Sequence, residues 1–316
     1  MTVGHGKVIL MGEHAVVFGH PAIAVAIEQA AQVSWEPSET GTTTLLITPG
    51  DTRVDTGPTP SPDHPLLKDA LKLARSMYPD ARELSLHARM SIPKGAGVGS
   101  SAALGVGILR AMDAARGASC SDSELFARSF AWEAVFHGTP GGIDNYMATH
   151  GGLVLFRRAY PLCEGVPIWQ QITAPRVVPC KPLRLLVADS GSRPPAIEMI
   201  LGVGALRKRN PRLVNGTFEA IALVVMNAKL AIEEGKLERL GQLLDTVHML
   251  LARLLLVSER VEQMVQAARF AGALGAKMTG AGGGGCMIAL VDSDERAAAV
   301  TAALAPFGTV FEAIAK

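Results

Sequence analysis

The amino-acid sequence predicts an α+β protein, with helices and strands mixed within two domains. With 316 residues, the chain exceeds the length of about 250–300 residues at which a single hydrophobic core usually stops growing. Apolar residues make up 48% of the chain and charged residues 19%, which is typical of globular proteins and not of disordered chains or coiled coils. Helix-like and strand-like apolar patterns occur in both halves, without an internal repeat.

Net charge and cysteine spacing limit the classes of partner. A formal net charge of +1 provides no broad electrostatic surface for nucleic acid or an anionic membrane. The four cysteines form no CxxC pair, so neither a zinc site nor a disulfide framework is indicated. No apolar run is long enough for a signal peptide or for the roughly 18 residues of a membrane span. We therefore expect a cytoplasmic protein that binds neither nucleic acid nor a membrane.

Turn-forming residues separate short apolar segments in the first half of the chain. Their patterns predict strands at residues 7–11, 22–27, 44–48 and 84–92. Residues 49–64 are dense in Pro, Gly, Asp and Thr, which predicts an exposed loop within the first domain. A helix is expected over residues 100–116, ended by Gly117. Ser121 and Glu124 have the spacing of a capping box and predict the start of the next helix.

The second half of the chain predicts a separate domain. Three prolines within residues 174–182 mark the expected boundary, which divides the chain into residues 1–178 and 179–316. Before this boundary, a further strand is expected at 152–156. Beyond it, the patterns predict strands at 183–188, on both sides of 282–285 and at the end of the chain, and helices near 195–208, 215–234, 237–252, 257–272 and 293–304.

A glycine-rich segment precedes the helix expected at residue 100. It reads PKGAGVGSSAA from Pro93 to Ala103 and has glycines at alternate positions. Such a loop exposes backbone N–H groups, and the following helix adds its positive dipole end, so the segment predicts phosphate binding. The alternative is a structural turn in which Ser100 caps the helix. The candidate nucleotide contacts are Lys94, Gly95, Gly97, Gly99, Ser100, Ser101 and Ala102.

An N-terminal segment, GKVILMGEHAVV, reads as a strand with charged residues at both ends. Lys7 provides a compact cation that can stabilise charge on a transferring phosphoryl group or a developing alkoxide. Glu13 and His14 are candidates for contact with a polar, anionic substrate. For His14 the alternative is a hydrogen-bonded structural histidine.

The segment HGTPGGIDN, residues 137–145, surrounds one carboxylate with conformationally special residues, which makes Asp144 a candidate base. The alternative is that Asp144 caps the helix that follows. Glu133 precedes His137 by one helical turn, and with the hydroxyl of Ser101 it is a candidate Mg²⁺ ligand. The Glu133–His137 spacing lacks the second histidine and glutamate of a zinc protease.

Another glycine-rich segment, GAGGGG at residues 280–285, lies between two expected strands. Successive glycines destabilise a chain unless its backbone passes close to something, so the run predicts the wall or lid of a ligand site. A flexible hairpin loop is the alternative.

In combination, GKVILMGEHAVVFG, PKGAGVGSSAALG and KMTGAGGGGC resemble the three motifs of the GHMP kinase superfamily, in the same order and over nearly the whole chain. The first segment resembles that of the mevalonate kinases. The resemblance implies an N-terminal domain like domain 2 of ribosomal protein S5, a C-terminal ferredoxin-like domain and a site between them. It also implies an often dimeric enzyme that uses ATP and Mg²⁺ to phosphorylate the 5-hydroxyl of mevalonate, on the route to isoprenoids.

The resemblance assigns roles to the candidate residues. Lys7 would polarise the substrate hydroxyl, Asp144 would act as catalytic base, and Ser101 with Glu133 would hold Mg²⁺ on the phosphates. The residues expected to face mevalonate are Glu13, His14, Gly280 and Ala281.

Three places differ from the pattern of the superfamily. Before Lys7, residues 4–6 read Gly-His-Gly where Ala-Pro-Gly is common. Gly141 stands where many relatives have serine, and residues 193–196 read Arg-Pro-Pro-Ala where a Ser/Thr region is expected. Two alternatives therefore stay open: a related kinase with another alcohol acceptor, and a ligand sensor of the same fold without catalytic activity.

Overall fold

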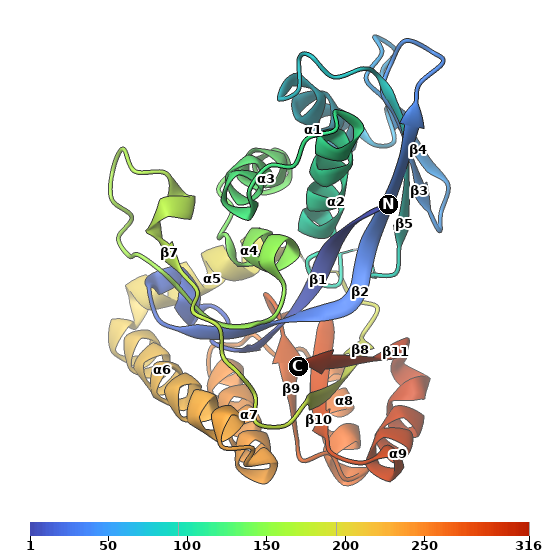
Figure 1. Ribbon diagram of the computed structural model, residues 1–316. Helices are drawn as coiled ribbons and strands as arrows, with labels where there is room; N and C mark the ends of the chain where they lie inside the picture. The colour runs from blue at the N-terminus through green and yellow to red at the C-terminus, as the bar shows by residue number, and fades with distance from the viewer. Residues whose placement is uncertain (94, 194, 316) are drawn as a thin grey trace. The chain divides into compact units, whose positions relative to one another are not determined.

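The computed structural model describes residues 1–93, 95–193 and 195–315, and the chain separates into two compact units (Figure 1). The two units interleave along the sequence. Unit 1 comprises Met1–Gly6, Glu28–Lys94 and Gly99–Gly151, and unit 2 comprises Lys7–Ile27, Gly95–Val98 and Gly152–Lys316. The single division at 178/179 that the sequence suggests stays a prediction.

Unit 1 contains one end of a sheet. Within it, the second half of β2 (Ala22–Pro37) pairs antiparallel with β5 (Leu84–Met90), β3 (Thr44–Thr48) pairs parallel with β5, and β4 (Thr52–Asp55) pairs antiparallel with β3. Strand β1 (Thr2–Met11) pairs with β2. Buried and exposed residues alternate along β5, so one face of the sheet belongs to the core.

The described residues of unit 1 also form four helices: α1 (Pro65–Ser76), α2 (Ser100–Ala115), α3 (Asp122–His137) and α4 (Ile143–His150). Helix α2 is mostly buried and packs against α3, α4 and β5 (Figure 1). The capping box of Ser121 and Glu124 at the start of α3 is confirmed, as is the positive φ of 67° at Gly117 after α2. Local sequence signals therefore set the end of α2 and the start of α3.

Unit 2 contains a four-stranded antiparallel sheet in the order β11-β8-β10-β9. Its strands are β8 (Leu183–Asp189), β9 (Gly275–Thr279), β10 (Cys286–Val291) and β11 (Val310–Ala315). All residues of β9 and β10 are buried, which explains the continuous apolar run of β10, whereas β9 buries Lys277 and Thr279 among its residues. With helices between β8 and β9 and between β10 and β11, this is the ferredoxin-like arrangement that the resemblance implied.

The helices of unit 2 are α5 (Ala196–Arg209), α6 (Pro211–Glu233), α7 (Leu237–Ala252), α8 (Glu259–Phe270) and α9 (Asp294–Leu304). Within the described part of the chain, α6 alone is long and apolar enough to cross a membrane by length and composition. It packs against α5 and α7 and buries eight of its residues against them and their neighbours. The same unit contains β6 (Leu153–Arg158) beside the first residues of β2, the two-residue strand β7 (Ile172–Thr173), and three short 3₁₀ helices, Ala15–Phe18, Ile168–Gln171 and Ala305–Phe307.

The elements that were not predicted from the sequence include strands β4 and β7, helix α1 and the three 3₁₀ helices. Strand β4 lies inside residues 49–64, so the expectation of a loop there was partly wrong. Thr52 and Val54 are buried on either side of exposed Arg53, which gives β4 the alternation of a half-buried strand despite its turn-forming neighbours. Helix α1 buries Lys68, whose Nζ lies 3.2 Å from Asp55 Oδ1 at the end of β4.

A close backbone contact between α7 and β9 makes Gly275 irreplaceable on steric grounds. A Cβ atom at Gly275 would lie 2.1 Å from Gly241 O, and one at Gly241 would lie 2.1 Å from Leu274 O. Because backbone cannot move aside cheaply, we expect Gly275→Ala to lower the free energy of unfolding by about 3 kcal/mol. Gly216→Ala is the matched control, since a Cβ there meets open space within α6, and we expect it to raise stability by about 0.5–1 kcal/mol. Urea unfolding followed by circular dichroism measures both, and equal midpoints for the two variants would contradict the close contact.

Candidate active site

Strand β1 carries Lys7 into unit 2, where the lysine contacts the glycine-rich loop. The side chain of Lys7 is buried, its Nζ donates to Gly97 O at 2.8 Å, and its backbone N–H donates to Val98 O at 2.9 Å. Ala96 and Val98 are buried, whereas Gly95 and Gly97 are exposed and have positive φ angles of 66° and 78°. The loop is thus anchored by its apolar residues, and its glycines stay open to a ligand.

The turn after β1 carries Glu13 and His14, and it places His14 against the glycine run at 280–285. Gly12 has a φ of 101°, and a Cβ atom there would lie 2.5 Å from Ala22 Cα, so only glycine fits. His14 itself has a φ of 58°, an uncommon value that the surrounding structure has to hold. His14 Nε2 lies 2.7 Å from Ala281 O, so Nε2 carries the hydrogen and donates. Burial lowers the pKa of His14 and favours the neutral ring.

The run at 280–285 connects β9 to β10 and packs closely on two other segments. Gly280 and Gly285 both lie close to the glycine-rich loop. A Cβ atom added at Gly280 would lie 3.5 Å from Gly97 O, and one added at Gly285 would lie 3.2 Å from Ala96 O. A Cβ at Gly282 would lie 2.6 Å from Leu256 O. Backbone therefore passes close to backbone here, as the glycine content predicts.

The segment after β8 adds an arginine to this region. Arg193 forms a two-pronged ion pair with Asp189, with N–O distances of 2.7 and 2.5 Å. Burial acts to raise the pKa of Asp189, but hydrogen bonds from Arg193 and the backbone bring it below its ordinary value. The Arg193 side chain lies against Gly95, since a Cβ there would be 3.2 Å from Arg193 Cδ. An arginine thus adjoins the glycine-rich loop near the position where relatives are expected to have Ser or Thr.

In unit 1, the start of α2 contains the remaining residues that the sequence predicts as phosphate contacts. Gly99, with a φ of 78°, caps the helix, so Ser100 is its first residue and the alternative in which Ser100 is the cap is wrong. The first turn contains Ser101 and Ala102 and no acidic residue. Its N–H groups and dipole end are therefore available to an anion. Lys94 lies outside the described residues.

Glu133 and Ser101 provide the oxygen donors predicted for Mg²⁺. Trp132 Nε1 donates to Ser101 O at 3.0 Å, which holds the start of α2 against the part of α3 that carries Glu133. Glu133 is buried, and its Oε2 lies 3.6 Å from His137 Nε2. A hydroxyl and a carboxylate are hard ligands that suit Mg²⁺. Within residues 1–93, 95–193 and 195–315, no three His, Cys, Asp or Glu side chains are grouped to hold a metal.

Asp144 is the second residue of α4 and is half-buried. Gly142, with a φ of 89°, occupies the N-cap position, so the alternative reading of Asp144 as the cap is wrong. The next residue, Asn145, is buried and donates from Nδ2 to Ser129 Oγ at 3.0 Å. This bond fixes the first turn of α4, which carries Asp144, on α3.

The predicted site residues fall into two groups. Unit 2 brings together Lys7, Glu13, His14, Gly95, Gly97, Gly280 and Ala281, and unit 1 contains Gly99, Ser100, Ser101, Ala102, Glu133 and Asp144. Because Lys7 and Asp144 belong to different units, their approach to one substrate oxygen stays a prediction.

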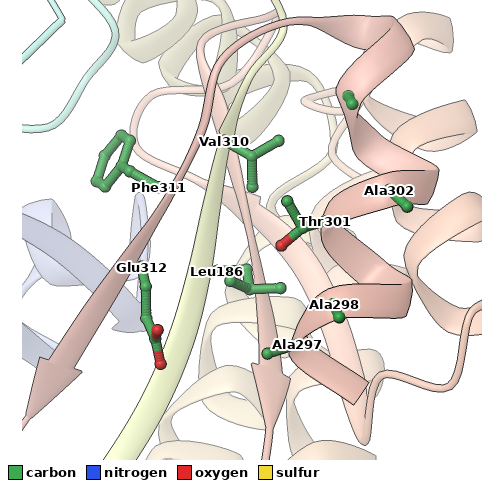
Figure 2. A pocket seen from close by; sticks show the side chains of 9 residues that line it. Leu186, Ala297, Ala298, Thr301, Ala302, Val310, Phe311 and Glu312 are labelled. Carbon is green, nitrogen blue, oxygen red and sulfur yellow. The ribbon is translucent and has the colours of Figure 1, made fainter. Parts of the chain in front are cut away.

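A groove of about 470 Å³ lies elsewhere in unit 2, between α9 and the strands β8 and β11 (Figure 2). Its walls consist mostly of small and apolar side chains, among them Leu186, Thr301 and Val310. The acidic residue in it, Glu312, accepts from Arg184 Nε at 2.6 Å. None of the predicted site residues lines the groove, and nothing in it suits phosphoryl transfer.

Two side chains of α7 support the strand that leads to the glycine run. His248 Nδ1 accepts from Met278 N at 3.3 Å, and Asp245 Oδ1 accepts from Ala276 N at 2.9 Å. Since Nδ1 accepts, His248 Nε2 carries the hydrogen and donates to Glu262 Oε2 at 2.9 Å. These bonds satisfy backbone groups of β9 that the sheet does not pair.

Burial lowers the pKa of His248 below its ordinary value of 6.5, which makes stability depend on pH. The unfolded chain binds a proton at His248 below about pH 6.5, whereas the folded chain resists it. The contribution of His248 to stability is therefore complete above pH 6.5 and is lost as the pH falls through its folded pKa, by up to about 1.4 kcal/mol per pH unit. We expect the free energy of unfolding, measured with urea, to fall less between pH 7.5 and pH 5.5 for His248→Gln than for the wild type. An unchanged difference would remove His248 from this role.

Taken together, the two mixed α/β units, the glycine-rich loop at a helix start and the buried lysine against that loop are features of a small-molecule kinase. Comparison with known families agrees. The model of the GHMP kinases N terminal domain matches residues 65–152, and the model named GHMP kinases C terminal matches residues 228–308. The chain belongs to the GHMP kinase family, and it is an ATP-dependent kinase. The predicted fold class is thereby confirmed.

Relatives with assigned activities point the same way. The mevalonate kinase of Pyrococcus furiosus is 33% identical over 324 residues, which cover 95% of this chain and 91% of that protein. The mevalonate kinase of Thermococcus gammatolerans is 32% identical, with coverages of 94% and 91%. Among solved structures, the L. major mevalonate kinase in complex with R-mevalonate is 26% identical, with a TM-score of 0.83 and coverages of 100% and 95%.

Proposed function

We propose that this protein transfers the γ-phosphoryl group of ATP to the 5-hydroxyl of mevalonate, with Mg²⁺. One observation carries the proposal: the N-terminal segment GKVILMGEHAVV contacts both glycine segments. Its Lys7 Nζ lies 2.8 Å from Gly97 O in the glycine-rich loop, and its His14 Nε2 lies 2.7 Å from Ala281 O in the run at 280–285. The relatives support the choice of acceptor, because the proteins of Pyrococcus furiosus and Thermococcus gammatolerans that match over more than 90% of both chains are mevalonate kinases.

In the proposed reaction, the 5-oxygen forms a bond to the γ-phosphorus while the bond from that phosphorus to the β,γ-bridging oxygen breaks and ADP leaves. Asp144 accepts the hydroxyl proton, and the Lys7 ammonium stabilises the charge that develops on the oxygens. Gly95, Gly97 and the first turn of α2 hold the phosphates through backbone N–H groups. Positioning and charge neutralisation are what this class of reaction requires.

Ser101 and Glu133 would hold Mg²⁺, as their hard oxygen atoms suit it. When bound, the ion neutralises phosphate charge. On the acceptor side, the proposed mevalonate contacts are Glu13, His14, Gly280 and Ala281. We further propose a cytoplasmic homodimer that binds neither nucleic acid nor a membrane, with functional domains of residues 1–178 and 179–316.

A second candidate is phosphorylation of a different alcohol by the same site. Arg193 is the observation that favours it, because a guanidinium beside Gly95 brings a charge where a hydroxyl was expected. Gly141 likewise provides no hydroxyl near Asp144. Either change alters the polar groups available to an acceptor.

A coupled ADP-release assay with a panel of acceptors tests the proposal. We expect turnover with mevalonate and none above background with phosphomevalonate, homoserine or galactose, and mass spectrometry should find a monophosphate of mevalonate. Turnover with another member and none with mevalonate would establish the second candidate. ATP binding without turnover of any acceptor would indicate a sensor.

A further inference from the structure

A buried ion pair joins β9 to Glu13, which follows β1 and precedes His14. Lys277, at the centre of β9, donates from Nζ to Glu13 Oε1 and to Met278 O, and the side chains of Lys277 and Glu13 are both 0% exposed. The Lys277 ammonium already donates to two acceptors of the protein, whereas the Glu13 carboxylate keeps one oxygen without a hydrogen bond among the described residues, so of the two groups Glu13 is the one suited to meet a substrate. Any effect of Lys277 on the reaction therefore has to pass through Glu13.

The Glu13 carboxylate has one bonded oxygen and one that is not. Within the described part of the chain, Oε2 is buried and has no hydrogen-bond partner. A buried carboxylate oxygen left without a partner costs free energy, so such an atom beside a site suggests an acceptor reserved for a ligand. The next residue, His14, donates to Ala281 O, which places Glu13 beside the glycine run.

Lys277 is held rigidly, because the two residues that follow it on β9 are both fixed. Two residues on, Thr279 Oγ1 accepts from Ile9 N at 3.1 Å and donates to Ile9 O at 2.9 Å. Between Lys277 and Thr279, the backbone N–H of Met278 donates to His248 Nδ1. The ammonium thus occupies a defined point behind Glu13.

We propose that Lys277 is a positioning residue for the acceptor, which holds Glu13 so that its second oxygen accepts a hydrogen bond from a hydroxyl of the substrate. The substrate class is an alcohol with a second hydroxyl besides the one that is phosphorylated. This inference rests on the proposed function and makes it more specific.

Charges around the pair decide what happens when Lys277 is removed. Burial raises the pKa of Glu13, and the charge and hydrogen bond of Lys277 act against that rise, with a smaller effect from Lys7 on β1. Burial lowers the pKa of Lys277 and of His248 on α7, which also faces the Lys277 charge. Without Lys277, the pKa of Glu13 rises further, and the protonated acid donates where the substrate hydroxyl needs an acceptor.

The test is Lys277→Met, studied by steady-state kinetics between pH 6 and pH 9. We expect the KM for mevalonate to rise at least about tenfold, the KM for ATP to stay within about twofold, and kcat/KM for mevalonate to fall as the pH decreases, because Glu13 takes up a proton. Lys68→Met is the matched control, since Lys68 is also a buried lysine paired with a carboxylate, and it should leave both KM values unchanged. In the double variant Glu13→Gln/Lys277→Met, the raised KM should persist and its pH dependence should disappear.

The proposal is overturned if Lys277→Met binds mevalonate with an unchanged KM, or if the pH dependence persists in the double variant. If the single variant does not fold, the double variant decides, because a pair of neutral residues removes the uncompensated buried charge. Failure of the proposed function has a different signature, namely a wild type that does not turn over mevalonate. In that case, the wild type and the Lys277 variants are compared with whichever alcohol the enzyme does phosphorylate. If it phosphorylates no alcohol, their affinities for mevalonate are compared by calorimetry.

Discussion

Replacing Asp144 by Asn is expected to lower kcat by about 10²–10⁴-fold, the contribution typical of a general base, while ATP affinity stays within about twofold of the wild type. Asparagine has the shape of aspartate but cannot accept the proton of the alcohol. The fold should tolerate the change, since Gly142 caps α4 and Asn145 anchors it. Initial rates with saturating mevalonate and ATP give kcat, and calorimetry gives the ATP affinity.

Asp122→Asn provides the matched control for this loss. Asp122 also lies in the first turn of a helix in unit 1, but it is exposed and belongs to none of the predicted contacts. It should retain full kcat. Full activity of Asp144→Asn would remove Asp144 from the role of base, whereas equal losses in both variants would indicate a general effect of helix-end charge.

Replacing Lys7 by Met is expected to lower kcat by about 10²–10³-fold, because the ammonium that stabilises charge in the transition state is lost. Methionine keeps most of the length of the side chain, so packing around this buried position should persist. The lost hydrogen bond to Gly97 O should cost about 1 kcal/mol of stability. The expected fall in kcat is thus larger than the loss of stability can explain. Thermal unfolding measures the change in stability, and initial rates measure kcat.

Lys229→Met is the control for removal of a lysine. Lys229 pairs with Glu233 at 2.6 Å on the surface of α6, where an exposed i,i+4 pair contributes about 0.3–0.5 kcal/mol. We expect unchanged kcat in this variant. If Lys7→Met retains more than about a tenth of the wild-type kcat, Lys7 does not stabilise the transition state as proposed.

Local signals in the sequence predicted much of the fold. The capping box at Ser121 and the glycine at 117 fixed helix ends because both act through bonds within a few residues. Alternate glycines before α2 likewise predicted an open backbone loop, and Gly95 and Gly97 indeed have positive φ angles and exposed positions. Such features depend on the chain's immediate neighbours and can be read from a single sequence.

Features that depend on distant partners could not be predicted in this way. Lys277 lies inside the motif KMTGAGGGGC, yet its partner Glu13 is 264 positions away, and a lone lysine in an apolar strand is as consistent with a strand edge as with a buried ion pair. A charged residue within an otherwise buried strand was the available signal. Strand β4 and helix α1 were missed for the same reason, since Lys68 becomes part of a buried face only through Asp55.

The central claim is that Lys7 and Asp144, which belong to different compact units, act on one alcohol oxygen. A crystal structure of the protein with mevalonate, Mg²⁺ and a non-hydrolysable ATP analogue measures this directly. We predict that Lys7 Nζ and an Asp144 carboxylate oxygen both lie within about 3 Å of the mevalonate 5-oxygen, with the γ-phosphorus in line. A complex in which either side chain stays beyond the reach of a hydrogen bond, direct or through one water, would contradict the account.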